Sequence, residues 1–144
     1  MRKICMLCCM VASIISLPTV SFGLDGEELA PGYNRCMESA TGTFDMLQCG
    51  QDAYLYWEEK LTEAYKSLRA RCHTLEGRSL EQCQDYVEKI EKNCQEYREQ
   101  GMNLLHIFYG EDNQLARLEA QQFNIMATQK QAGDLASLTS PVRK

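Results

Sequence analysis

The residues best suited to chemistry in this chain are its cysteines. Five of them follow the apolar N-terminal run: Cys36, Cys49, Cys72, Cys83 and Cys94. Cysteines can pair as disulfides, bind a metal as thiolates or act as nucleophiles. A metal site is not indicated, because these five show no CxxC spacing and the two histidines show no HxxxH spacing. A catalytic pair of Cys72 with His73 is also disfavoured, because adjacent helical residues point in different directions.

Paired acids offer little catalytic potential either. They occur at Glu27-Glu28, Glu58-Glu59 and Glu111-Asp112. A glycosidase needs two acids placed about a cleft, and the slender helical bundle that the periodicity predicts provides none. The sequence contains no GxSxG, no glycine-rich phosphate loop and no HExxH motif. We therefore expect a protein that is not an enzyme and that uses neither a cofactor nor a metal.

The N-terminus matches a cleaved secretory signal peptide at residues 1–23. Two basic residues precede an uncharged apolar run at 4–17, and small residues follow a proline. The run is shorter than the roughly 20 apolar residues that span a bilayer, and no second stretch could span one. Cleavage two residues earlier is an alternative, and lipid attachment at Cys8 or Cys9 is disfavoured because large residues precede both. We expect a periplasmic or secreted protein without a membrane span after cleavage.

Removal of this peptide leaves 121 residues with 13 Lys and Arg against 20 Asp and Glu, a formal charge of −7. This length suffices for one core but not for two. We expect a flexible leader at 24–32, a single domain at 33–139 and a tail at 140–144. The acidic balance disfavours nucleic acid as a partner. It suits a cationic partner through electrostatic steering, although a solubilising surface is the simpler explanation.

The strongest periodic signal lies between Leu80 and Phe108. Apolar or small residues recur there at alternating steps of three and four, which only a long α-helix places on one face. They are Leu80, Cys83, Val87, Ile90, Cys94, Tyr97, Gly101, Leu104 and Phe108. Such a narrow stripe needs partner helices to cover it. Ser79 is expected to cap the start of this helix, and Gly110 follows where a left-handed residue ends one.

Two further long helices are expected, one on each side. The first covers 43–72, and Thr43 and Asp45 favour its start. Its apolar stripe recurs every seven residues at Leu47, Tyr54, Leu61 and Leu68. The other begins near Gln114, with an expected buried face of Leu115, Leu118, Gln122, Ile125, Gln129, Ala132, Leu135 and Leu138. With a short helix at 33–40 and short loops, we predict an all-α fold: an antiparallel three-helix up-down-up bundle with a short N-terminal helix.

Helix geometry limits the disulfides. Cys83 and Cys94 are separated by about 16 Å of helix rise, whereas a disulfide needs Cα atoms within about 7 Å. Cys72 and Cys83 flank one helical hairpin and can meet, and a break after the short helix brings Cys36 back to Cys49. We therefore predict that Cys36–Cys49 and Cys72–Cys83 staple the bundle, and that Cys94 is a buried free thiol. The alternative joins Cys36 to Cys94 and leaves Cys49 free.

Several segments resemble one protein family. They are Tyr33-Asn34-Arg35-Cys36, Asp45-Met46 before Cys49, Leu61-Thr62-Glu63-Ala64-Tyr65 and Tyr97-Arg98-Glu99. Together they resemble the N-terminal-type domain of the lysozyme inhibitor LprI family, which consists of small exported bacterial proteins. Glu58 and Thr62 stand where that family usually has Asp and Asn. Gln131 replaces an arginine, and the later family cysteines are altered, with Phe123 near the last of them.

The resemblance implies an exported all-α domain that inhibits lysozyme. Its partner would be c-type lysozyme or another cationic protein. The alternative is a non-enzymatic structural or protein-interaction module of the bacterial envelope, with a homodimer formed through Cys94. For the inhibitor role we expect contacts from helix-end loops, which a rigid scaffold presents well. The candidate contact residues are Glu76, Arg78, Glu111, Asp112 and Asn113 in two loops at opposite ends of the bundle, and Tyr56 on a helix face away from the core.

Overall fold

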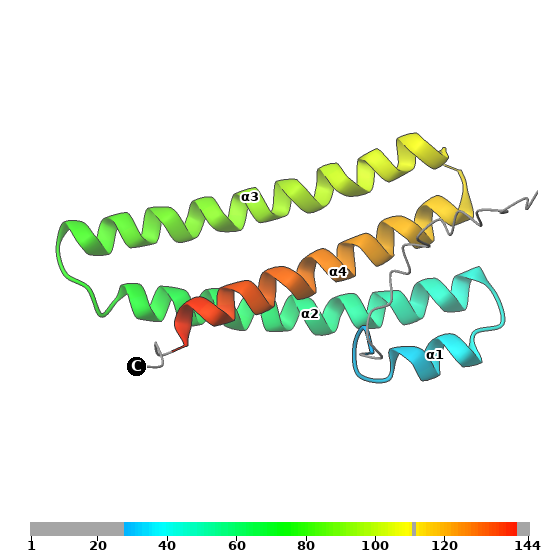
Figure 1. Ribbon diagram of the computed structural model, residues 1–144, viewed down its shortest axis with the longest axis horizontal. Helices are drawn as coiled ribbons and strands as arrows, with labels where there is room; N and C mark the ends of the chain where they lie inside the picture. The colour runs from blue at the N-terminus through cyan, green and yellow to red at the C-terminus, as the bar shows by residue number, and fades with distance from the viewer. Residues whose placement is uncertain (1–27, 111, 141–144) are drawn as a thin grey trace, which may run out of the picture.

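The structure is a computed structural model that describes residues 28–110 and 112–140 (Figure 1). Within these ranges it contains α1 (Tyr33–Ser39), α2 (Thr43–Cys72), α3 (Arg78–Tyr109) and α4 (Gln114–Thr139), and no strand. The three long helices run up, down and up, and α1 folds back beside the start of α2 (Figure 1). The predicted all-α bundle is confirmed. The signal peptide, Glu111 and residues 141–144 lie outside the described residues.

An acid holds the first turn of α2, rather than the hydroxyl expected at Thr43. Asp45 Oδ2 accepts hydrogen bonds from Oγ1 and from the backbone N of Thr41, at 2.6 and 2.9 Å. Both bonds favour the carboxylate and therefore lower the pKa of Asp45, the hydroxyl bond more strongly. Thr43 instead donates through Oγ1 to Gln114 Oε1 at 3.0 Å. This contact joins the first turn of α2 to the first turn of α4.

The two ends of α3 differ in how well the sequence indicated them. α3 begins at Arg78, and its N-cap is Gly77 without a side-chain cap, so Ser79 lies inside the first turn and the predicted cap was wrong. α3 ends at Tyr109 as expected. Gly110 follows with a φ of 87°, a left-handed conformation that glycine adopts without steric cost.

The closest pairing in the bundle joins α2 and α4, and α4 also contacts α3. Small residues make up most of the buried face of α4: Ala116, Ala120, Ala127, Thr128 and Ala132, with Ile125 and Leu135. The expected face of larger residues was therefore partly wrong, since Leu115 and Leu138 are 48 and 56% exposed. At Gly50 the two helices approach so closely that an added Cβ would lie 2.0 Å from Gln121 Oε1. The Gln121 amide donates to the Leu47 carbonyl at 2.8 Å and bridges the same crossing.

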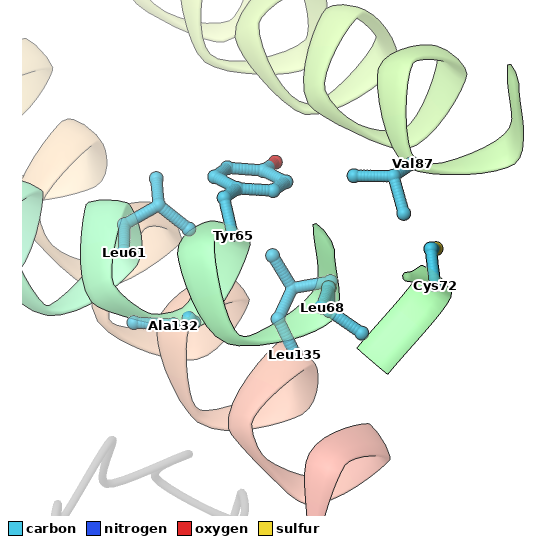
Figure 2. Packing of buried hydrophobic residues seen from close by; sticks show 8 residues of the cluster. Leu61, Tyr65, Leu68, Cys72, Val87, Ala132 and Leu135 are labelled. Carbon is cyan, nitrogen blue, oxygen red and sulfur yellow. The ribbon is translucent and has the colours of Figure 1, made fainter. Parts of the chain in front are cut away.

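Side chains from all three long helices form the main core (Figure 2). Leu61, Tyr65 and Leu68 of α2 lie among Val87 of α3 and the α4 residues Ala132 and Leu135. Full burial of each leucine side chain contributes about 1.5–3 kcal/mol. The core therefore fixes the N-terminal half of α3, where Val87 is its one fully buried residue among those described.

The apolar stripe of α3 becomes exposed toward its C-terminal end. Val87 is buried and Ile90 packs against the core, whereas Leu104 and Phe108 are 49 and 69% exposed. On a straight helix a strict heptad stripe drifts by about 20° per heptad, or about 80° between Leu80 and Phe108. The drift turns the last part of the stripe away from α2 and α4, beyond Gly101, which still faces Phe123 of α4. The expectation that partner helices cover the whole stripe was therefore wrong.

Leu29 and Ala30 pack against α2, although the sequence suggested a flexible leader at 24–32. Leu29 and Ala30 are 9 and 3% exposed. Trp57 Nε1 donates to the Leu29 carbonyl at 2.6 Å. An indole N–H within an apolar cluster needs an acceptor, and the irregular backbone before α1 supplies it. This segment, α1 and the first half of α2 thus form one packed unit.

The crossing of α3 and α4 predicts opposite effects of two alanine substitutions. An added Cβ at Gly101 would lie 2.2 Å from Cε1 of the Phe123 ring, whereas nothing lies within 4 Å of one at Gly133. We expect Gly101→Ala to destabilise the protein by about 1–2 kcal/mol, because overpacking outweighs the gain in helix propensity. Gly133→Ala should stabilise it by up to about 1 kcal/mol. Urea unfolding of the oxidised variants measures both, and stabilisation by Gly101→Ala would contradict this crossing.

Candidate partner-binding surface

Two disulfides connect the helices, and they are the pairs that helix geometry favours. Cys36 in α1 joins Cys49 in α2, with Cα atoms 5.7 Å apart. Cys72 at the end of α2 joins Cys83 in α3, with Cα atoms 5.6 Å apart. The first fixes α1 on the bundle, and the second closes the α2–α3 hairpin. Disulfides of this kind are typical of an oxidising compartment.

Cys94 is a free thiol that is half-buried on the inner side of α3. Its neighbour on α2 is Tyr65, whose hydroxyl oxygen is buried. Burial raises the pKa of Tyr65, and the nearby Cys94 thiol adds to the rise because a thiolate would repel a phenolate. The thiol therefore serves packing in the described fold, and a homodimer through Cys94 stays a prediction.

An ion pair and an amide connect the middle of the three long helices. Arg98 Nη2 of α3 lies 3.3 Å from Glu58 Oε1 of α2. The Arg98 guanidinium also donates to Gln131 Oε1 of α4, and Gln131 Nε2 donates to the Cys94 carbonyl at 3.3 Å. The side chains of Arg98 and Glu58 are only 12 and 30% exposed, so solvent screens the pair less than a surface pair.

Tyr54 extends this network on the α2 side. Burial raises the pKa of the Tyr54 phenol, and hydrogen bonding to the Glu58 carboxylate raises it further, because both favour the neutral phenol. The positions of Glu58, Arg98 and Gln131 are among those that carry or vary the family resemblance. These three residues come from three different helices and Arg98 contacts the other two, so they hold the helices in position. They stabilise the scaffold and do not themselves form an exposed binding surface.

Neither a metal site nor a membrane helix is evident in the parts of the chain that the structure describes. No group of three or more His, Cys, Asp or Glu side chains could hold a metal ion there. None of the described helices combines the length and the apolar character needed to cross a membrane.

The structure places the predicted contact residues in three separate regions. Glu76 and Arg78 lie exposed at the α2–α3 turn. Asp112 and Asn113 lie exposed at the α3–α4 turn, and α3 separates the two turns by roughly 48 Å of helix. Tyr56 is half-buried with its ring 5.0 Å from that of Trp57, so it is less available for contact than expected. Glu111 lies outside the described residues.

Asn113 caps α4 and closes the α3–α4 turn. Asn113 Oδ1 accepts from the backbone N of Leu115 at 2.9 Å, and its Nδ2 donates to the Tyr109 carbonyl at 3.0 Å. The Asn113 side chain is thus already engaged in hydrogen bonds within the turn. A partner would instead contact the surroundings of this capped turn.

Those surroundings are apolar. Of the large apolar side chains that are exposed in the described residues, about half lie at the end of the bundle where α2 begins, α3 ends and α4 begins (Figure 1). We call this set the α3–α4 end surface: Phe44, Leu104, Ile107, Phe108, Tyr109 and Leu115. The opposite end exposes only Leu75 and Leu138 among the described residues of this kind. Apolar side chains that gather on one part of a surface mark interaction sites.

The sequence analysis chose the turn beside this surface but missed its apolar members. A signal was present, because residues 104–109 are all apolar or aromatic except for His106, which is more than the single apolar face that a core needs. Phe44 gave no such signal, since contacts between distant segments, such as that of Thr43 with Gln114, bring the start of α2 to this end.

Comparison with protein families identifies the class to which this disulfide-stapled helical scaffold belongs. The family model described as "Lysozyme inhibitor LprI" matches residues 36–135. The chain therefore belongs to the lysozyme inhibitor LprI family, which confirms the resemblance of its motifs. Comparisons with curated proteins and with solved structures gave no match. The matched range includes both disulfides, the Arg98 network and the α3–α4 turn.

Removal of Arg98 tests whether the polar network supports the bundle. Arg98→Ala leaves the Glu58 carboxylate without its ionic partner and the Gln131 amide oxygen without its donor, and we expect a loss of about 2–3 kcal/mol in the free energy of unfolding. The matched control is Lys92→Ala on the same helix, whose 3.9 Å pair with Glu96 is exposed and should contribute less than about 0.5 kcal/mol. Equal effects of the two substitutions in urea unfolding would show that the network carries no special weight.

The Cys36–Cys49 disulfide makes a separate prediction with a spectroscopic readout. Trp57 is the only tryptophan in the chain and contacts the segment that leads into α1. Replacing both cysteines with serine frees α1, and we expect a stability loss of about 2–4 kcal/mol and a red shift of the Trp57 emission. Cys94→Ser should leave the emission maximum unchanged. An unshifted spectrum in the double variant would mean that α1 stays docked without the disulfide.

Proposed function

We propose that this chain is an exported, non-enzymatic protein that binds and inhibits lysozyme. The observation that carries the proposal is membership of the lysozyme inhibitor LprI family over residues 36–135. Export from the cytoplasm follows from the predicted signal peptide at residues 1–23. It agrees with two disulfides, which persist in an oxidising periplasmic or extracellular environment.

The charge of the chain fits such a partner. The 121 residues after the predicted cleavage site carry a formal charge of −7, and a c-type lysozyme is a cationic protein. Opposite net charges raise the rate of encounter and disfavour wrong partners, while the final affinity depends on close contacts. Inhibition then results from occlusion, because a bundle seated over the active-site cleft excludes the cell-wall polymer without any chemical step.

A titration of lysozyme activity tests this function. We expect the oxidised chain from Leu24 onward to reduce the clearing of a bacterial cell-wall suspension by c-type lysozyme in a dose-dependent, stoichiometric manner. The effect should weaken between low and moderate salt, because electrostatic steering is screened with a Debye length of about 10 Å at 0.1 M. The same chain after reduction and alkylation is the control and should inhibit less. Undiminished clearing at a large molar excess of the oxidised chain would refute the proposal.

A further inference from the structure

We infer that the α3–α4 end surface is the docking surface of this chain, and that its occupant is a basic lysozyme. The inference rests on the proposed function and adds the contact surface and the kind of contact. Apolar anchors at this end hold the partner, and acids beside them attract it.

The exposure of the anchors supports this assignment. Ile107 and Phe108 at the end of α3 are 75 and 69% exposed, and Phe44 at the start of α2 is 79% exposed. Helices in a small bundle ordinarily turn such residues inward. At this end none of the described helices covers them: Phe108 lies on the part of the α3 stripe that has drifted away from its neighbours, and Ile107 and Phe44 lie outside that stripe. A partner that covers them gains the same burial free energy that a core would.

The rigidity of this end favours binding. The Thr43–Gln114 bond joins α2 to α4, the Asn113 cap closes the turn, and the Arg98 network holds α3 at mid-length. Anchors on such a scaffold lose little conformational freedom on binding, so more of their burial free energy is available as affinity. A helix end with its turn is also convex, and its complement is a concave site such as an enzyme cleft.

The charges around the surface select the occupant. Within three residues of its members the described ionised side chains are Asp45, Asp112 and Arg117, and the sequence adds Glu111. The balance is acidic, as it is for the whole chain. A second copy of the chain is disfavoured as an occupant, because a symmetric contact would bring two acidic turns together. A cationic protein gains from the same acids.

Because the apolar side chains hold the partner and the acids attract it, substitutions of the two kinds should change different rate constants. Serine at both Ile107 and Phe108 removes anchors and should raise the dissociation rate, weakening the affinity for lysozyme at least tenfold. Asp112→Asn removes a rim charge and should lower mainly the association rate, by less than about tenfold, with a weaker dependence of that rate on salt. Tyr86→Ser is the matched control, because Tyr86 is a 65% exposed aromatic on α3 far from this end. It should leave both rates unchanged.

Surface plasmon resonance with immobilised c-type lysozyme measures these rates, and thermal melting of each oxidised variant confirms that it is folded. The expected result is fast dissociation for the Ile107→Ser/Phe108→Ser variant alone. Binding of this variant with the affinity of the unsubstituted chain would overturn the docking surface and leave the proposed function intact. An equal loss in Tyr86→Ser would also overturn it. Failure of the unsubstituted chain to bind would overturn both the surface and the proposed function.

Discussion

The close approach of α2 and α4 determines how the other elements of this chain are arranged. An alanine-rich face on α4 and the absence of a side chain at Gly50 let the two helices meet, with the Gln121 amide bridging the crossing. The resulting pair presents two surfaces. α3 packs on one through Val87 and the Arg98 network, and α1 is fastened to α2 by the Cys36–Cys49 disulfide. The positions of α3 and α1 therefore depend on the pairing of α2 with α4.

The same arrangement explains why the molecule is apolar at one end. The heptad stripe of α3 drifts away from its neighbours beyond Gly101, and Leu104 and Phe108 are left exposed at this end. Such exposure lowers stability and favours aggregation unless a partner covers the apolar side chains. Family membership supplies the class of partner, and the acidic balance agrees with it. Packing and exposure are thus consequences of one helical geometry.

Much of the fold could be predicted from the sequence because its determinants are local. Periodicity indicated α2 at 43–72, glycine indicated the end of α3 at Gly110, and helix rise excluded a Cys83–Cys94 disulfide. The errors concern distant contacts. Alanines on α4 proved more buried than Leu115 and Leu138, because closeness to α2 rather than residue size decides burial there. Gly77, and not Ser79, is the N-cap of α3. Leu29 packs on Trp57, a contact between distant residues that no local sequence pattern indicates. The end surface combines three helices, so only the assembled bundle brings its members together.

Hydrogen exchange of the chain with and without c-type lysozyme tests the central claim most directly, since it locates the partner without any substitution. Backbone amides at the first turn of α2, the last two turns of α3 and the first turn of α4 should become protected in the complex. Amides at the α2–α3 turn, between Cys72 and Arg78, should exchange as they do in the free protein. Protection confined to the α2–α3 turn, or spread evenly along α2 and α4, would contradict an account in which the end of α3 meets the partner.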